Sequence, residues 1–465
     1  MKIEQIYTGC LSQGAYYIES EGEIAIIDPL REVQPYLEKI ANDNGKLKFI
    51  FETHFHADFV SGHVTLSEKT GAPIIFGPNA NPKFEAYIAK DQEVFMLGKI
   101  TITALHTPGH TMESTCYLLK DENGNDHALF SGDTLFLGDV GRPDLAQKAA
   151  TMTQEDLAGY LFDSLRTKIM VLADDVIVYP AHGAGSACGK NLSKETVGSI
   201  GNQKATNYAL RADMTKEEFI AEVTDGLLPP PAYFPMNVKL NKEGYADVAR
   251  LIGDAKSINA KNFKTIAEER NAFVLDVRHQ NEFEKGFIPN SIFIGIDGGF
   301  APWVGTLILD HKQEILLLTP KDREAETITR LARVGYDNVI GFLEGGINAW
   351  IEEGYKIDTL QSITAETLET RFKENIQVFD VRKPSEYSSE HIVDVPSTPL
   401  DFLNNHLSEF PKNNDFYLHC AGGYRSVIAA SILKSRGYNN VINVYGGFAA
   451  IKNTAIAITN STCQV

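Results

Sequence analysis

Histidine and aspartate residues recur in the first half of the chain directly after short apolar runs. The first group is HFHAD, which supplies His54, His56 and Asp58 after the run KFIFET. Imidazole and carboxylate groups bind borderline or hard divalent metal ions. Three further motifs, HTPGHT, SGDT and YPAHG, each add one such residue: His110, Asp133 and His182. One cluster alone would also fit a solvated loop, but four segments in this order predict a metal site.

The apolar runs before these motifs have the composition of β-strands. EIAIID, ITITALH, HALFSG and VIVYP are rich in β-branched or other apolar residues and are followed or ended by aspartate, histidine, glycine or proline. Strands that deliver such residues to one rim of a sheet build a site on a rigid scaffold. The proline-rich stretch 226–237 is expected to be extended and to close this part of the chain.

The second half contains a duplicated segment. AFVLDVRHQNEFEKGFIPNS at 272–291 is echoed by IQVFDVRKPSEYSSEHIVDV at 376–395, and both alternate strand-like with helix-like runs. The repetition predicts two α/β domains with parallel sheets. We therefore expect a multi-domain α/β protein with domains at 1–255, 256–360 and 361–465.

The second copy carries a cysteine loop, in FYLHCAGGYRS. A strand-like run ends at Cys420, and a helix is expected from about Ser426. The loop residues between them are Ala421, Gly422, Gly423 and Tyr424. Inward backbone amides and a positive helix end favour a thiolate or persulfide anion, and Arg425 strengthens that field. The alternative role for this cysteine is that of a small buried hydrophobic residue.

The first copy lacks this cysteine. Its corresponding region is ILLLTPKDREAE, with Thr319 at or beside the position of the sulfur. A threonine cannot carry sulfane sulfur, so this module is predicted to be a structural or docking copy. Asp276 and Arg278 of the DVR motif are retained there, which indicates that this motif serves the fold more than catalysis.

The composition is that of a globular protein with an acidic surface. Lys and Arg number 43 against 61 Asp and Glu, and 43 − 61 gives −18, a charge that disfavours nucleic acid and anionic membranes as partners. No apolar run approaches the ~20 residues of a membrane span, and the first residues lack the layout of a signal peptide. Five scattered cysteines form no disulfide framework, so we expect a reducing, cytoplasmic compartment.

Taken together, HxHxD, TPGHT, GDT and PAHG resemble the metallo-β-lactamase superfamily over about residues 1–250. That resemblance implies an αββα sandwich with the metal between two sheets. Dinuclear hydrolases of the superfamily, glyoxalase II among them, follow HxHxD with a histidine that binds a second metal ion. Here Phe59 occupies that position and offers no ligand, so one metal ion is expected.

The wider pattern THFHADFVSGH, TPGHTMES, SGDTLFLGDVGRPDL and YPAHGAGSACGK is similar to persulfide dioxygenases. The resemblance implies one Fe(II) per chain bound by His54, His110 and Asp133, although zinc also suits these ligands. His56, Asp58 and His182 would then orient ligands or water, or be residual architecture. Arg142 falls where the family places an arginine near the substrate; a structural salt bridge is the alternative.

CAGGYR resembles the active-site loop of rhodanese sulfurtransferases, which implies that Cys420 carries sulfane sulfur. Cys188, in GAGSACGK, is either a nucleophile that accepts sulfur from a bound persulfide or a plain loop thiol. The whole chain resembles fused persulfide dioxygenase–rhodanese proteins of bacterial sulfide detoxification. The expected reactants are a small thiol persulfide and O₂, with sulfite and thiosulfate as products, and a homo-oligomer is expected.

Two other functions stay open at this point. A glyoxalase II-like zinc thioester hydrolase is compatible with the shared superfamily motifs, against which stand Phe59 and the rhodanese-like copies. The second alternative is a sulfur carrier or scaffold with a vestigial metal site. The intact set of metal ligands argues against it.

Overall fold

The computed structural model describes residues 1–146, 152–190, 192–374 and 376–459, which fall into two compact units. Unit 1 comprises residues 1–250 and 331–336, and unit 2 comprises residues 251–330 and those from 337 onward. The chain folds into two compact units, whereas the sequence predicts three domains. The predicted limits 1–255, 256–360 and 361–465 therefore stay a prediction. Within the described ranges, the search for a helix both long and apolar enough to cross a bilayer finds none.

Two six-stranded sheets form the centre of unit 1. In spatial order the first contains β1 (Lys2–Thr8), β2 (Gln13–Ser20), β3 (Glu23–Ile27), β4 (Lys46–Phe51), β5 (Ile74–Phe76) and β6 (Tyr87–Ile88). The second contains β12 (Gly198–Ser199), β11 (Ile177–Pro180), β10 (Asp126–Gly132), β9 (Thr115–Lys120), β8 (Ile100–His106) and β7 (Val94–Leu97). Aromatic and aliphatic side chains from both sheets, Tyr16 and Phe130 among them, pack in the space between.

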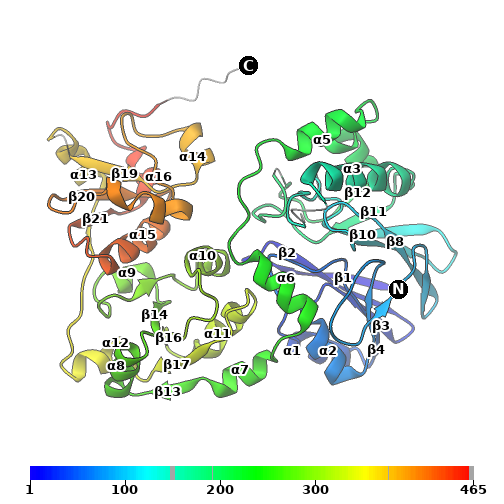
Figure 1. Ribbon diagram of the computed structural model, residues 1–465, viewed down its shortest axis with the longest axis horizontal. Coiled ribbons are helices and arrows are strands. Elements are labelled where there is room, and N and C mark those ends of the chain that lie inside the picture. The colour runs from blue at the N-terminus through cyan, green and yellow to red at the C-terminus, as the bar shows by residue number, and fades with distance from the viewer. Residues whose placement is uncertain (147–151, 191, 375, 460–465) are drawn as a thin grey trace. The chain divides into compact units, whose positions relative to one another are not determined.

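Helices cover the outer faces of this pair of sheets. They are α1 (Gln34–Asn42), α2 (His63–Thr70), α3 (Gln154–Ser164), α4 (Ile200–Thr206), α5 (Lys216–Thr224) and α6 (Phe234–Glu243), with a π-helical turn η1 (Leu165–Ile169) and a 3-10 turn η2 (Tyr208–Leu210). Figure 1 shows α1 and α2 beside the first sheet and α3 and α5 beside the second. The predicted αββα sandwich is therefore confirmed.

The prediction of an extended segment at 226–237 is wrong in its second part, because α6 begins at Phe234. Pro235 stands in the first turn of α6, where its missing N–H has no intrahelical partner to lose. The helix is then held by the buried side chain of Asn241, which donates to the carbonyl oxygens of His56 and Phe59. Proline in the sequence therefore marks a helix start here rather than a break.

Strand direction brings the chemistry-bearing residues of unit 1 to one edge. β8 and β10 are both antiparallel to β9, and β10 is parallel to β11, so β8, β10 and β11 point the same way. The residues after their carboxyl ends are the segments with His110, Asp133 and His182. A backbone hydrogen bond of 2.9 Å from Thr115 N to Thr53 O ties this edge to the loop after β4.

Unit 2 contains two parallel sheets, one for each copy of the duplicated segment. The first has the order β13 (Lys256–Ile258), β17 (Val339–Leu343), β16 (Ile315–Leu318), β14 (Phe273–Asp276) and β15 (Ile292–Phe293). The second has the order β18 (Gln361–Ile363), β21 (Val441–Val444), β20 (Phe416–His419) and β19 (Gln377–Asp380). Strand pairs within both sheets are parallel, as predicted.

Helices alternate with these strands along the chain. They are α7 (Val248–Asp254), α8 (Ala260–Glu269), α9 (Gln280–Phe283), α10 (Phe300–Leu307), α11 (Glu324–Ala332), α12 (Gly346–Glu352), α13 (Ala365–Phe372), α14 (Pro384–Ser389), α15 (Tyr424–Ser435) and α16 (Gly447–Ile451), with 3-10 turns η3 (Leu400–Asn405) and η4 (Leu407–Glu409). The helix after the cysteine loop thus starts at Tyr424, two residues before the predicted position.

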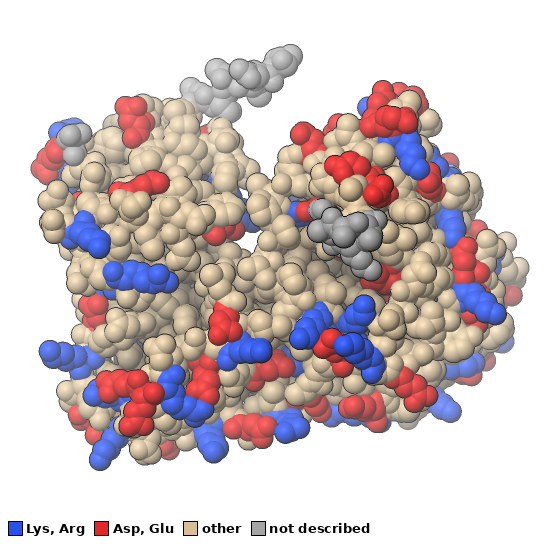
Figure 2. All heavy atoms as spheres, in the orientation of Figure 1, with Lys and Arg blue, Asp and Glu red and all other residues tan. Residues whose placement is uncertain are grey.

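The molecular surface carries charges of both signs. Figure 2 shows basic and acidic side chains intermingled on the visible face rather than gathered by sign. Pairs such as Lys39–Glu4 at 2.8 Å and Lys216–Asp163 at 2.7 Å are partly exposed. Exposed ion pairs contribute about 0–1 kcal/mol each, so the fold depends on its buried contacts.

One buried ion pair is repeated in the two copies. Arg278 Nη2 lies 2.6 Å from Asp276 Oδ2, and Arg382 Nη2 lies 2.6 Å from Asp380 Oδ2. Each arginine also donates to a backbone carbonyl eight residues further on, Gly286 O in the first copy and Glu390 O in the second. The DVR motif thus fastens the strand end to the following loop in both copies, including the one without a cysteine.

We expect Arg278→Met to lower the free energy of unfolding of unit 2 by about 3–5 kcal/mol, because it leaves a buried carboxylate unpaired. Burial already raises the pKa of Asp276 despite its bonds to Arg278. Both tryptophans of the chain, Trp303 and Trp350, belong to the first copy, so fluorescence during urea unfolding reports on it. Arg270→Met is the matched control, because the Arg270 side chain is 51% exposed beside Glu314. Equal midpoints for the two variants would contradict the expectation.

Candidate metal centre and cysteine loop

His54, His110 and Asp133 meet at the strand-end edge of unit 1. Their candidate ligand atoms lie within 4.8 Å of one another, and all three residues are buried. Asp133 Oδ2 is 3.8 Å from His54 Nε2 and 3.5 Å from His110 Nε2. The rings of His54 and His110 are perpendicular, with centroids 4.9 Å apart. Three ligands converge from two sheets, which is the arrangement predicted from the motifs.

The far nitrogen of each histidine is held by a hydrogen bond that fixes the tautomer. His110 Nδ1 lies 2.9 Å from the carbonyl oxygen of Arg142, so it donates and leaves Nε2 as an acceptor. Thr53 Oγ1 donates to Asp28 Oδ2 at 2.8 Å and therefore accepts from His54 Nδ1 at 3.0 Å. Both Nε2 lone pairs are thereby directed at the centre, as metal ligation requires.

The carboxylate of Asp133 tests whether this set fits a metal ion. Both of its oxygens are buried and lack a hydrogen-bond partner in the described part of the chain. A buried carboxylate without donors is strongly destabilising unless a cation or a donor neutralises it. A divalent ion coordinated by Asp133 and the two imidazoles would remove that penalty, so the residues present fit a metal ion.

His182 and Asp58 form a second pair beside this centre. His182 Nε2 is 3.3 Å from Asp58 Oδ2 and 3.6 Å from Asp133 Oδ1. Burial alone would lower the pKa of His182, but the carboxylates of Asp58 and Asp133 outweigh it and hold the pKa well above its usual value. Burial likewise opposes ionisation of Asp58, and His182 overcomes it and lowers the pKa of Asp58. The pair is charged and faces Asp133.

The candidate ligand atoms of Asp58, His182 and His56 lie within 4.8 Å of one another. His56 also reaches a buried polar network that includes Glu52, a residue that no motif predicts. His56 Nε2 is 3.1 Å from Asp28 Oδ1 and 3.8 Å from Glu52 Oε2. Burial and the charge of Asp28 raise the pKa of Glu52 well above its usual value, which favours the protonated form of this carboxyl. Ser61 Oγ donates to Glu52 Oε1 at 2.5 Å, and His63 Nδ1 lies 3.5 Å from the same oxygen. Both residues therefore belong to this network.

Phe59 fills the position at which a dinuclear site would have a further histidine. The side chain is fully buried, and its ring lies 4.3 Å from that of His56 and 6.4 Å from that of His182. Asn241 of α6 holds the same loop by donating to the carbonyl oxygens of His56 and Phe59, each at 2.8 Å. The loop is therefore fixed from outside with an apolar ring turned inward.

Residues 331–336 also hold this loop within unit 1. Val60 N donates to Arg333 O at 2.7 Å, and the buried Arg31 donates to Ala332 O at 2.6 Å. Arg333 forms a bidentate pair with Glu32. A stretch distant in sequence thus contributes to the support of the metal motif, a contact that no local pattern predicts.

Arg142 acts on the centre through its backbone. Its guanidinium makes a bidentate pair with Asp144, with both N–O distances 2.7 Å, and donates to the carbonyl oxygens of Ala187 and Leu228. The side chain therefore ties three loop segments together, as in the structural alternative considered for it, while its own carbonyl orients His110. Thr111 likewise bonds Ser114 Oγ at 2.8 Å in a turn.

Cys188 lies at the edge of the centre. Its sulfur belongs to a group with Asp133 and His182 whose candidate ligand atoms lie within 4.8 Å of one another. Burial, followed by the charges of Asp58 and Asp133, raises the pKa of the Cys188 thiol far above its usual value. The neighbourhood thus favours the neutral thiol, and Cys188 as a nucleophile stays a prediction.

Cys420 follows β20 in unit 2, and its sulfur contacts one backbone amide and one hydroxyl group. Gly423 N donates to Cys420 Sγ at 3.1 Å, and Ser426 Oγ lies 3.5 Å from the same sulfur. Gly423 has φ 102°, a conformation that favours glycine. The Arg425 guanidinium forms two hydrogen bonds with the Glu386 carboxylate, one of them 2.8 Å from Nη2 to Oε1. The negative charge of Glu386 therefore weakens the electrostatic effect of Arg425 on the Cys420 sulfur.

The first copy keeps the shape of this loop without the chemistry. Asp276 pairs with Leu318 in the sheet as Asp380 pairs with His419, so the next residues, Thr319 and Cys420, are equivalent. The third residue after Thr319, Asp322, has a positive φ of 63°. The third residue after Cys420, Gly423, also has a positive φ. Thr319 Oγ1 bonds Glu324 Oε1 at 3.1 Å instead of holding a reactive group.

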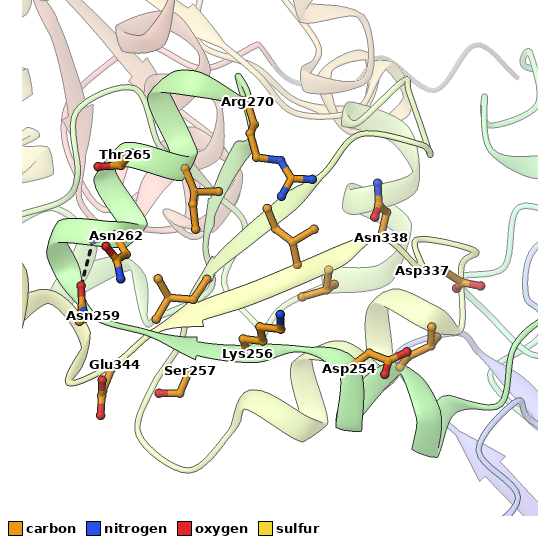
Figure 3. Close-up of a pocket in the computed structure, with 15 residues that line it drawn as sticks. Asp254, Lys256, Ser257, Asn259, Asn262, Thr265, Arg270, Asp337, Asn338 and Glu344 are labelled. Atoms are coloured by element: carbon orange, nitrogen blue, oxygen red, sulfur yellow. Dashed lines mark hydrogen bonds between the residues drawn. The ribbon is translucent and has the colours of Figure 1, made fainter.

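A pocket of about 700 Å³ opens elsewhere in unit 2, between β13, β17 and α8 (Figure 3). Asn259 and Asn262 lie on one wall, where the Asn259 side chain accepts from Asn262 N to cap α8, and Arg270 on another wall is paired with Glu314. Cysteine and histidine are absent from the described residues that line it. The described lining of the pocket therefore offers neither a thiol nor an imidazole.

Comparison with known proteins matches three stretches of the chain to two families. Residues 8–182 match the family model of the metallo-β-lactamase superfamily, and residues 259–353 and 364–454 match that of the rhodanese-like domain. A metallo-β-lactamase structure from Staphylococcus aureus is 30% identical, with TM-score 0.66, over 74% of this chain and 99% of that chain. ETHE1 from Myxococcus xanthus is 28% identical, with TM-score 0.44, over 52% of this chain and 98% of that chain.

A curated relative bears a different name. A probable hydroxyacylglutathione hydrolase of Schizosaccharomyces pombe is 30% identical over 38% of this chain. The match spans 66% of that relative, just under two thirds of its own length. The Staphylococcus structure, by contrast, is covered almost completely, and the matched part of this chain extends beyond the sandwich of unit 1.

We expect Asp133→Ala to abolish tight metal binding, because it removes the one anionic ligand of the three-residue set. Metal content after reconstitution, measured by inductively coupled plasma mass spectrometry, should fall from about one equivalent to below a tenth. His106→Ala is the control, since His106 bonds Met112 O outside the centre. Equal metal content in the Asp133→Ala protein and the unaltered chain would contradict the assignment.

We expect His63 to stay neutral well below neutral pH. Burial, with the charge of His56, lowers the pKa of His63 to about 3, against an ordinary value of 6.5. The unfolded chain therefore binds a proton that the folded chain does not, and stability falls as pH drops from 6.5 towards 3, by up to ~1.4 kcal/mol per pH unit. Unfolding free energies at pH 7 and 5 should differ less in His63→Gln than in the unaltered chain. An equal loss in both would contradict the expectation.

Proposed function

Because the chain belongs to the metallo-β-lactamase superfamily and carries two rhodanese-like domains, we propose that it is an Fe(II)-dependent persulfide dioxygenase coupled to a sulfurtransferase. The observation that carries the proposal is the presence in one chain of a two-histidine, one-carboxylate centre and a cysteine whose sulfur accepts a hydrogen bond from a backbone amide. Such a ligand set leaves coordination positions open, as in non-haem iron oxygenases. The loop of Cys420 suits an anionic sulfur.

The first reaction consumes a small thiol persulfide. Its balance is R–S–SH + O₂ + H₂O → R–SH + SO₃²⁻ + 2 H⁺, so the terminal sulfur is oxidised and dioxygen is reduced. A bound Fe(II) supplies the redox chemistry that lets dioxygen react with this sulfur. His54, His110 and Asp133 would hold the ion, with Asp28–Thr53 and the Arg142 carbonyl fixing the imidazoles. His182 lies between Asp58 and Asp133, and the charges of these two carboxylates raise its pKa.

The second reaction uses Cys420. Its thiolate attacks the outer sulfur of a persulfide, a new S–S bond forms, the old one breaks, and R–S⁻ leaves. Transfer to sulfite then gives Cys–S–S⁻ + SO₃²⁻ → Cys–S⁻ + S₂O₃²⁻, without net oxidation. The Gly423 amide stabilises negative charge on the Cys420 sulfur during both steps. We propose that thiosulfate is the product of the coupled reactions.

A zinc thioester hydrolase is the second candidate, favoured by the match to the Schizosaccharomyces relative. The Asp58–His182 pair beside Asp133 retains part of a dinuclear ligand set. Against it stands Phe59, whose ring offers no ligand where the second ion would need one. The rhodanese-like domains would also have no task in thioester hydrolysis.

The deciding experiment is oxygen uptake by protein loaded with iron under anaerobic conditions, with glutathione persulfide and coenzyme A persulfide as substrates. We expect persulfide-dependent uptake that Asp133→Ala abolishes, because the metal is lost. Hydrolysis of lactoylglutathione by zinc-loaded protein is measured in parallel. Thioester hydrolysis without persulfide-dependent uptake would reject the dioxygenase in favour of the hydrolase.

Cys420→Ser separates the two reactions. We expect oxygen uptake and sulfite formation to continue, while thiosulfate formation falls to the rate of the uncatalysed reaction, because serine forms no persulfide. Products are quantified by monobromobimane derivatisation and chromatography, with Cys116→Ser as a control for a buried cysteine outside both sites. An unchanged thiosulfate yield would reject the coupling.

A further inference from the structure

The side chain of Tyr424 joins the cysteine loop to the copy that lacks a cysteine. Tyr424 is the first residue of α15, directly after the amide that contacts the Cys420 sulfur. Its hydroxyl donates to Gly295 O at 2.7 Å, and its ring meets that of Phe293 at a centroid distance of 5.9 Å. Both partners follow or belong to β15 of the first copy, within the same compact unit.

Two glycines make room for this ring. A Cβ at Gly298 would lie 2.3 Å from Cζ of Tyr424, and a Cβ at Gly295 would lie 3.2 Å from its Cε2. Neither glycine has a positive φ, so backbone conformation does not require glycine at either position. The space taken by Tyr424 gives the reason for glycine at 298, and the two glycines with Phe293 are here named the tyrosine socket.

The socket is itself fixed to the vestigial loop of the first copy. Asp297, between the two glycines, is 2.7 Å from Arg323, which stands four residues after Thr319. Arg330 of α11 donates to Ile296 O at 2.6 Å. The cysteine-free loop of the first copy therefore supports the socket that receives Tyr424.

The cysteine loop has one anchor in its own domain and one in the socket. Phe448 N and Ala449 N of α16 donate to the carbonyl oxygens of Cys420 and Ala421, at 2.7 and 3.0 Å. These bonds hold the start of the loop. Its other end, at Gly423, leads directly into Tyr424, and a hydroxyl from the same helix, Ser431 Oγ, accepts from Phe293 N at 3.0 Å.

We propose that the cysteine-free copy positions the Cys420 loop by receiving Tyr424 in the tyrosine socket. Tyr424 is a positioning residue, since it acts on the sulfur only through the backbone amide of Gly423. A shift of a few tenths of an ångström at the helix start would move that amide relative to the Cys420 sulfur and weaken stabilisation of the anion. The proposal rests on the proposed sulfur-carrying role of Cys420.

A double-mutant cycle on the full-length protein tests the socket. Gly298→Ala places a methyl group in the ring, and Tyr424→Ala removes the ring. Each should lower kcat for sulfur transfer from thiosulfate to cyanide roughly ten-fold with a smaller change in KM, as overpacking or loss of the anchor displaces the loop. In the double variant Gly298→Ala should have no further effect, because its clash partner is gone. Tyr424→Phe, which loses the hydroxyl bond alone, should lower kcat about five-fold.

Gly299→Ala is the matched control, because a Cβ there meets Trp303 only at an ordinary 3.4 Å. It should stay within two-fold of the unaltered chain, since it touches no part of the socket. Multiplicative losses in the double variant, or equal losses from Gly299→Ala and Gly298→Ala, would overturn the proposal.

A separate readout distinguishes failure of the socket from failure of the function. The rate of iodoacetamide alkylation at Cys420, followed by peptide mass spectrometry, depends on loop geometry and needs no sulfur substrate. An unaltered chain that transfers no sulfur would refute the proposed role of Cys420. The alkylation series would then decide the socket by the same pattern: coupled losses support it, and independent losses overturn it.

Discussion

The carboxylate of Asp133 is the group on which the architecture of unit 1 depends. It is buried, and within the described chain neither oxygen meets a hydrogen-bond donor. Such a group is tolerated only if opposite charge is brought to it, and the fold directs the Nε2 atoms of His54, His110 and His182 towards it. Burial lowers the pKa of His54, so that imidazole is neutral and a ligand rather than a counter-ion. A metal ion bound by Asp133 and the two neutral imidazoles would supply that charge.

The second requirement is that the imidazoles do not rotate, and the chain meets it with groups far from them in sequence. Asp28 holds Thr53, which holds His54, while a loop carbonyl at Arg142 holds His110. The Arg142 side chain meanwhile ties its own loop to Asp144 and to the carbonyls of Ala187 and Leu228. Supports of this kind determine ligand geometry as much as the ligands do.

The motifs predict the ligands and the loop of Cys420 because strand ends leave a local trace: an apolar run followed by glycine, proline or a polar residue. The same trace predicts the sandwich and the duplicated parallel sheets. It does not predict Glu52 or Asn241, whose partners lie in other elements and whose polarity says nothing about burial. Nor does it predict α6, because proline favours a helix start as well as an extended segment, and tertiary packing decides between them.

The first copy keeps the backbone of the cysteine loop although it has no cysteine. Its loop keeps a left-handed residue at the same place, although the residue is Asp322 rather than glycine, and its buried Asp276–Arg278 pair is intact. The first copy thus has the backbone conformation of the cysteine loop without a residue that can carry sulfur. Shape is what a neighbouring domain uses, since Gly295 offers Tyr424 a carbonyl oxygen and Gly298 offers it space. A domain without the nucleophile can therefore still position a neighbouring loop through its backbone contacts.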